Sequence, residues 1–176
     1  MGKETEQKQE IVNQGVHTYS QEEAYVWPEE PVLREQLEWF QDQKLALMVH
    51  WGMYNQLGMV ACWALSDEDA EWSRKTVDWT DDGELFKRQY RALNRAFDPV
   101  AFQPEEWAKM AKKCGFRYLI LTTKHHDGFC LWDTAYTEYK TTAEECPFHT
   151  HKYADIVRAM FDAFRKEGLG IGAYFS

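Results

Sequence analysis

Four hydrogen-bonding side chains stand together at one point of the chain. Lys124, His125, His126 and Asp127 follow directly on the apolar and threonine-rich run 118–123. Adjacent histidines beside an acid suggest either hydrogen bonding to a polar ligand or a metal site. Alternate residues of a strand share a face, so a metal-binding pair would favour His-x-His over an adjacent pair. We therefore expect a site that binds a polar ligand without a metal ion, and a metal site or a structural role remains the alternative.

Two further polar residues follow apolar runs of the same kind. His50 comes after the run 45–49, and Tyr174 comes after the run 169–173. In parallel sheets and β/α barrels, ligands bind beyond the carboxyl ends of the strands. The sequence therefore predicts that His50, Tyr174 and the cluster 124–127 face one shared pocket. The plainer interpretations are a buried core histidine at 50 and a β-favouring aromatic at 174.

The elements that must position these residues alternate along the chain. Apolar residues at helical spacing predict helices at 31–42, 84–93, 104–114 and 152–166, and the short apolar runs predict strands at 45–50, 118–123 and 169–176. This order predicts a parallel sheet with the strands side by side in chain order, helices on one face and right-handed connections. The run 118–121 is continuous enough to predict a strand buried on both faces.

The connection 53–103 is far longer than the usual link between a strand and a helix. A long insertion at the carboxyl end of a strand is usually part of the site, and this one contains the pair Glu71 and Trp72. A solvated surface acid is the plainer interpretation of Glu71, because its neighbourhood is charged.

Composition limits the partners. The 176 residues carry a formal charge of -9, which argues against nucleic acid and anionic membranes and favours a neutral or cationic ligand. Residues 1–29 are expected to form a polar N-terminal arm, and 30–176 one domain. No secretory signal or apolar run of membrane length is visible, which predicts a cytoplasmic protein. The 4 cysteines show no metal or disulfide spacing and are expected as free thiols.

Several motifs, taken in order, resemble the retaining α-L-fucosidases of glycoside hydrolase family 29. They are HWG at 50–52, EW at 71–72, YRALNRAFDPVAFQPEEW at 90–107, TTKHHDGFCLWDTAYTEY at 122–139 and GIGAYFS at 170–176. A lone HWG would be weak, whereas KHHDGF followed by LWD and accompanied by the others is specific. The resemblance covers nearly everything from about Trp39 onward.

The resemblance implies that the chain is the N-terminal part of a (β/α)8 catalytic domain, with the first three strands and their helices. The resemblance also implies that this domain removes terminal α-L-fucose from glycans with retention of configuration. Matched position by position, the fucose-binding residues are His50, Glu71, Trp72, His125, His126 and Tyr174. The resemblance implies no metal and no cofactor.

In the family, the nucleophile is an aspartate at the end of the fourth strand, and the acid/base lies further on. Both are expected after Ser176, so we expect the 176-residue chain alone to be inactive and to associate through its open strand edge. The alternatives are a metal-dependent hydrolase that uses His125, His126 and Asp127, and a non-catalytic sugar-binding protein.

Overall fold

The computed structural model describes residues 26–67 and 71–176. Most of the predicted polar arm, 1–29, therefore lies outside the described residues. The chain divides into two compact units, Met1–Asp42 and Gln43–Ser176, and each is described by itself.

Helix α2 (Pro31–Gln43) confirms the helix predicted at 31–42. Proline fits its first turn because that position needs no backbone donor. The carboxylate of Glu30 accepts hydrogen bonds from the backbone N–H groups of Val32 at 3.1 Å and Leu33 at 2.5 Å. These bonds satisfy donors that the start of a helix leaves without partners.

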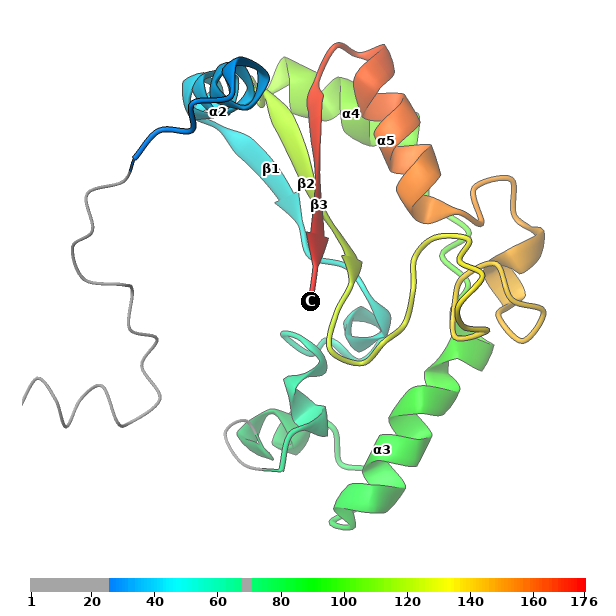
Figure 1. Ribbon diagram of the computed structural model, residues 1–176. Coiled ribbons are helices and arrows are strands. Elements are labelled where there is room, and N and C mark those ends of the chain that lie inside the picture. The colour runs from blue at the N-terminus through cyan, green and yellow to red at the C-terminus, as the bar shows by residue number, and fades with distance from the viewer. Residues whose placement is uncertain (1–25, 68–70) are drawn as a thin grey trace, which may run out of the picture. The chain divides into compact units, whose positions relative to one another are not determined.

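The second unit is built on a parallel sheet, as predicted. Strands β1 (Ala46–Val49), β2 (Tyr118–Lys124) and β3 (Gly170–Phe175) lie in the order β1-β2-β3. The carboxyl ends of all three point the same way in Figure 1. The residues that follow the strands are therefore brought to one edge of the sheet.

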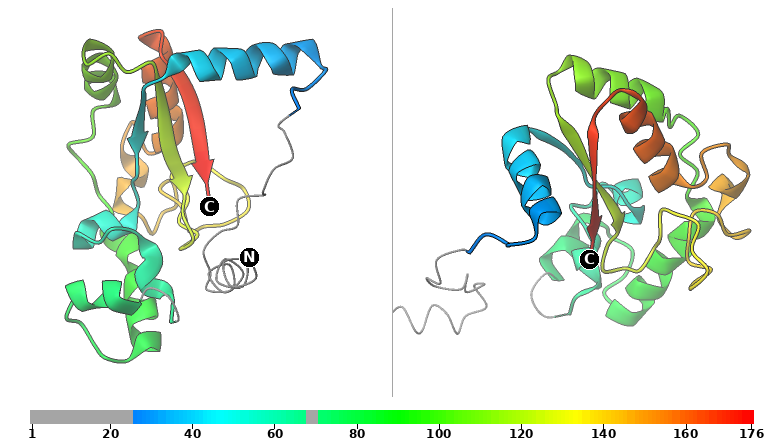
Figure 2. Two further views of the ribbon diagram at one scale, coloured as in Figure 1. Left: turned by 90° about the vertical axis from the view of Figure 1, so that its left-hand side faces the viewer. Right: turned by 45° about the horizontal axis from the view of Figure 1, so that its top comes forward.

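Helices α4 (Pro104–Lys113) and α5 (Ile156–Lys166) lie on the same side of the sheet (Figure 1, Figure 2). The core fills the space between them and one face of the strands. Its buried members include Ala108 and Ala111 of α4, Met160 and Phe164 of α5, and Leu119 and Leu121 of β2. Burial of these side chains is the main term that holds the helices on the sheet.

The other face of the sheet is less covered than predicted. Met48 is 51% exposed and Ile120 is half-buried, so the expectation that 118–121 is buried on both faces is wrong for this unit. A strand face is buried only where a second layer packs on it. Leu119 and Leu121 have that layer in α4 and α5, whereas the face of Met48 and Ile120 is only partly covered.

Two helix boundaries differ from the prediction by more than one residue. Helix α5 begins at Ile156 rather than at 152, because the side chain of Asp155 accepts from the N–H of Arg158 at 2.8 Å and so forms the N-cap. Helix α3 (Gly83–Arg91) ends two residues early and continues as the 3-10 helix η4 (Ala92–Ala96). Both differences lie at element ends, where the apolar pattern is weakest.

The insertion after β1 lies beyond the carboxyl ends of the strands, together with α3 (Figure 1). Besides η4, its described residues form the short 3-10 helices η1 (Met53–Leu57), η2 (Cys62–Leu65) and η3 (Glu71–Thr76). Another, η5 (Pro147–Thr150), lies in the loop after β2. The two long connections therefore meet at the edge of the sheet where the candidate site was predicted.

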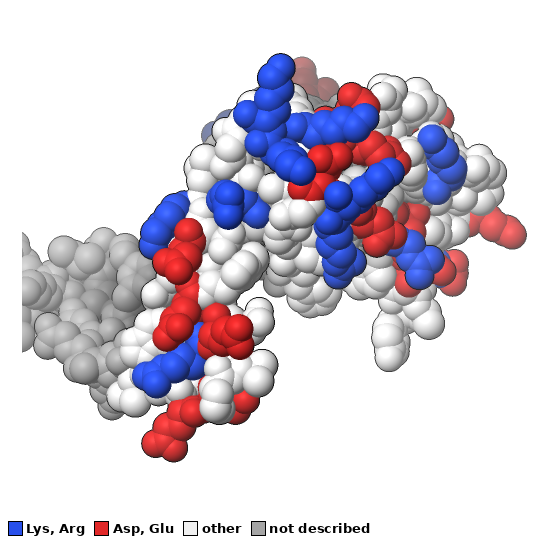
Figure 3. Space-filling model, turned by 90° about the horizontal axis from the view of Figure 1, so that it is seen from above, with Lys and Arg blue, Asp and Glu red and all other residues white. Residues whose placement is uncertain are grey.

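Lys109 pairs with Glu106 at 2.8 Å, and Lys112 of α4 pairs with Glu167 at 3.4 Å. The face seen in Figure 3 carries charges of both signs. This face therefore offers no uniformly basic surface to a polyanion. Within residues 26–67 and 71–176, no helix has the length and apolar character needed to span a bilayer.

Candidate functional site

Three histidines and a tyrosine meet at the carboxyl ends of the strands. The ring of His125 lies edge-on to His50 at 5.0 Å between centroids and edge-on to His126 at 4.7 Å. The ring of Tyr174 lies 6.4 Å from His125 and nearly parallel to it. Of the six residues predicted for the site, the structure thus brings these four together.

Strand register explains how residues so far apart in sequence meet. Val49 pairs with Leu121 across β1 and β2, so His50 comes level with Thr122. Thr122 pairs in turn with Tyr174 across β2 and β3. Because residues that are level on neighbouring strands project from the same face, the side chains of His50, Thr122 and Tyr174 lie on one face of the sheet.

Three supporting residues were not predicted. The hydroxyl of Thr122 lies 2.9 Å from Nδ1 of His50, and the ring of Tyr54 stacks on His50 at 5.0 Å. The thiol of Cys62 lies 2.8 Å from Nδ1 of His125. Parallel pairing could have indicated Thr122, but no sequence pattern indicates Tyr54 or Cys62.

Burial keeps two of the imidazoles neutral at physiological pH. Burial, helped by the neighbouring groups of His126, His50 and Lys124, lowers the pKa of His125 to about 4. Burial alone lowers the pKa of His50. A neutral imidazole has one donor and one acceptor nitrogen, which suits the hydroxyls of an uncharged ligand.

Asp127 is held inside the loop after β2. Its carboxylate accepts from the hydroxyl of Tyr90 at 2.8 Å and from the backbone N–H of Phe129 at 3.1 Å. Burial raises the pKa of Asp127, and the hydrogen bond from Tyr90 opposes that rise. The next residue, Gly128, has a φ of 84°, which favours glycine and lets the loop turn tightly. These contacts give Asp127 a role in shaping the loop.

Within the described ranges, no group of three or more His, Cys, Asp or Glu side chains is placed to hold a metal ion. His125 and His126 are adjacent in the chain, and their rings lie edge to face. The donor set of the metal alternative is therefore not assembled in this part of the chain.

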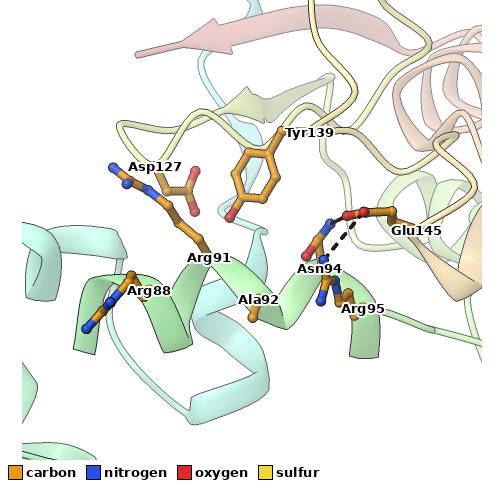
Figure 4. Close-up of a pocket in the computed structure, with 8 residues that line it drawn as sticks. All are labelled: Arg88, Arg91, Ala92, Asn94, Arg95, Asp127, Tyr139 and Glu145. Atoms are coloured by element: carbon orange, nitrogen blue, oxygen red, sulfur yellow. Dashed lines mark hydrogen bonds and ion pairs between the residues drawn. The ribbon is translucent and has the colours of Figure 1, made fainter. Parts of the chain in front are cut away.

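A cavity of about 360 Å³ opens beside His126. Its lining comes from η2, the end of α3 and the loop after β2, and consists of Cys62, Trp63, Leu65, Ser66, Arg91, His126 and Asp127. Figure 4 shows a neighbouring cavity that shares Arg91 and Asp127. There, Glu145 accepts from Asn94 at 3.4 Å and pairs with Arg95 at 3.4 Å. One of these two cavities thus borders His126 on the side of the insertion.

The remaining two predicted residues lie in η3. Trp72 is 51% exposed, and the side chain of Glu71 lies outside the described part of the structure. The prediction that the insertion brings Glu71 over the histidines therefore stays a prediction, as does a binding role for Trp72.

Residues 12–176 match the profile of the family described as alpha-L-fucosidase. The chain belongs to the α-L-fucosidase family. The rat tissue alpha-L-fucosidase is 30% identical over 138 residues, which cover 78% of this chain and 29% of the relative.

Crystal structures of a family 29 α-L-fucosidase from Bacteroides thetaiotaomicron are similar in fold. One has a TM-score of 0.63 and 29% identity over 86% of this chain and 31% of its own. Another has a TM-score of 0.62 and 28% identity over the same shares, and is described as a covalent intermediate trapped with 2-fluoro-fucosyl fluoride. The α-L-fucosidase chain described here therefore spans less than a third of the length of these relatives.

The catalytic domain of these structural neighbours is a (β/α)8 barrel, and the three parallel strands form part of one. The predicted partial barrel is confirmed. The less covered face of Met48 and Ile120 is the face that side chains of further strands fill in a closed barrel.

Proposed function

We propose that this chain forms part of the fucose pocket of a retaining α-L-fucosidase that removes terminal α-L-fucose from glycans. The observation that carries the proposal is the cluster of His50, His125, His126 and Tyr174 at the strand ends, in a chain of this family. Glu71 and Trp72 complete the pocket from the insertion.

The chemistry of the cluster suits an uncharged sugar. His125 and His50 are neutral at physiological pH because burial lowers the pKa of each. Their free ring nitrogens can exchange hydrogen bonds with hydroxyls, and the ring of Tyr174 offers an aromatic surface to a methyl group. A deoxy sugar needs no basic pocket, in agreement with a formal charge of -9.

Retention requires two carboxyl groups about 5 to 5.5 Å apart, one as nucleophile and one as acid/base. The covalent intermediate of the Bacteroides enzyme supports the same chemistry in a relative. Asp127 is committed to Tyr90 and to the backbone of Phe129, so we assign it no part in the displacement. The nucleophile and the acid/base then belong to parts of the protein outside these 176 residues.

Release of nitrophenol from a nitrophenyl α-L-fucoside tests this division of roles. The purified chain should show no turnover above buffer, and neither should the variant His126→Ala. Turnover by the chain that His126→Ala abolishes would contradict the proposal, because the chain would then contain a working pair of carboxyls. A hydrolysis that only added metal ions restore would support the metal-dependent alternative.

A non-catalytic sugar-binding protein would keep the same pocket. A longer form of the protein that includes the segment matching the relatives' catalytic carboxyls separates the two, because only an enzyme releases nitrophenol. The family match favours the enzyme.

A further inference from the structure

A buried thiol contacts one of the pocket histidines. Sγ of Cys62 lies 2.8 Å from Nδ1 of His125, and the two residues are 2% and 5% exposed. They are 63 positions apart, so the long insertion delivers the thiol to the strand end. A polar contact this short between two buried groups fixes the orientation of both.

Both partners are neutral. Burial, together with the negative charge of Asp127, raises the pKa of the Cys62 thiol to about 12. His125 has its pKa lowered to about 4, chiefly by burial. The pair is therefore a thiol and an imidazole at physiological pH, and it differs from the thiolate and imidazolium of a nucleophilic cysteine site.

The direction of the hydrogen bond follows from the strengths of the two acceptors. An unprotonated imidazole nitrogen is a strong acceptor, whereas a thiol sulfur is a weak one. The bond with S–H as donor and Nδ1 as acceptor is therefore favoured over the reverse. The proton of the neutral ring then resides on Nε2.

Nε2 of His125 is left for a ligand. It makes no hydrogen bond to the side chains and backbone groups that the structure describes, and it is not among the buried atoms without a partner. The ring that carries this N–H lies beside the rings of His50, His126 and Tyr174, which the proposed function assigns to the sugar pocket.

We propose that Cys62 is a positioning residue of the sugar pocket, and that its thiol holds His125 in the tautomer whose Nε2–H donates to a ligand oxygen. The choice of ligand rests on the proposed function, whereas the choice of tautomer rests only on the contact between the two side chains. Cys62 itself touches neither the sugar nor the reacting atoms.

The tautomer can be read directly in the chain labelled with ¹⁵N-histidine, by long-range correlation between ring nitrogens and ring protons. At neutral pH, His125 should show an unprotonated Nδ1 and a protonated Nε2. A protonated Nδ1 in the unsubstituted chain would overturn the proposal, whatever the variants do. This measurement needs neither a variant that folds nor a bound ligand.

Two substitutions of Cys62 separate positioning from packing. Cys62→Ala should give a mixture of both tautomers and an affinity for L-fucose about tenfold weaker. Cys62→Ser keeps a donor and should restore the single tautomer and most of the affinity. An unchanged tautomer in Cys62→Ala would contradict the proposal.

Cys146→Ala is the matched control. Cys146 is also fully buried, and its thiol donates to the backbone oxygen of Phe97 at 3.4 Å rather than to a histidine. This variant should lose stability without changing the His125 tautomer. If the tautomer behaves as expected but L-fucose fails to bind, the proposed function is wrong and the positioning role of Cys62 stands.

Discussion

Nδ1 of His50 lies 2.9 Å from the hydroxyl oxygen of Thr122, and this contact joins the end of β1 to β2 at the floor of the site. Thr122 has no exposed surface, so the hydrogen bond is shielded from water. The contact exists because parallel register places the residue after Val49 level with the residue after Leu121. Sheet pairing thus sets the orientation of the first pocket histidine.

Thr122→Val should weaken L-fucose binding, because it removes the partner of His50 while keeping the shape of the side chain. Loss of a buried hydrogen bond of this kind costs about 1 to 3 kcal/mol. Isothermal titration with L-fucose measures the loss of affinity, and denaturant unfolding measures the loss of stability. Thr141→Val is the control, since the hydroxyl of Thr141 is equally buried and has no partner among the described residues. Equal losses in both variants would contradict a specific role for Thr122.

His125 should make the stability of the fold fall in mild acid. Its pKa is about 4 in the folded chain against 6.5 in the unfolded chain, so the unfolded state binds more protons between these values. Stability is therefore complete above pH 6.5 and is lost as the pH falls toward 4, by at most about 3 kcal/mol. Burial lowers the pKa of His50 in the same direction, whereas the raised pKa of Asp127 acts in the opposite one.

The contribution of His125 is isolated by comparison with His125→Asn, which keeps an acceptor near Cys62 and does not titrate. Urea unfolding at pH 7 and pH 5 gives the change in unfolding free energy with pH for each chain. The unsubstituted chain should lose more stability between the two values than the variant. An equal loss of stability in the unsubstituted chain and in His125→Asn would show that the imidazole of His125 titrates normally in the folded state.

Gly52 is required by space rather than by backbone conformation. Its φ of -178° is open to any residue, but an added Cβ would lie 2.5 Å from Cε1 of Tyr54. Gly52→Ala should therefore displace the ring that stacks on His50 and cost about 1 to 3 kcal/mol. Gly172→Ala is the control, because the nearest atom to its added Cβ is 3.4 Å away. Thermal unfolding compares the two variants, and equal melting temperatures would contradict the clash.

The cluster of histidines and tyrosine at the strand ends was predictable from the sequence, but the residues that hold these side chains in place were not. Short apolar runs locate His50, His125 and Tyr174 after parallel strands, and parallel strands bring their ends to one edge. The contact between Cys62 and His125 depends on how the insertion 53–103 folds. Outside the helix predicted at 84–93, that segment has little apolar periodicity, so tertiary contacts set its path.

The start of α5 shows a different limit. The predicted helix begins at 152, whereas its apolar stripe and the observed helix α5 both begin at Ile156. Asp155 is an N-cap residue type, and treating it as one would have given the observed boundary. Capping chemistry is thus more informative than periodicity at this helix end.

The sheet edge at β3 should cause self-association of the 176-residue chain. Its outer backbone groups pair with no described strand, and Phe175 at its end is 66% exposed. Light scattering after size-exclusion chromatography should show mass rising with concentration. Phe175→Glu should reduce it, because the acid can pair with Lys124, which now lies 4.4 Å from the ring. Val100→Glu, at an exposed position outside the sheet, should leave the self-association unchanged. A monomer at all concentrations would contradict the prediction.

Titration of the ¹⁵N-histidine-labelled chain with L-fucose tests the fucose pocket most directly. The ring signals of His50, His125 and His126 should shift and saturate, whereas those of His149 and His151, which lie in and next to η5, should stay fixed and serve as internal controls. His126→Ala should weaken the saturation, and D-glucose should not reproduce it. Fixed signals for all three pocket histidines at saturating L-fucose, in a chain shown to be folded, would contradict the account.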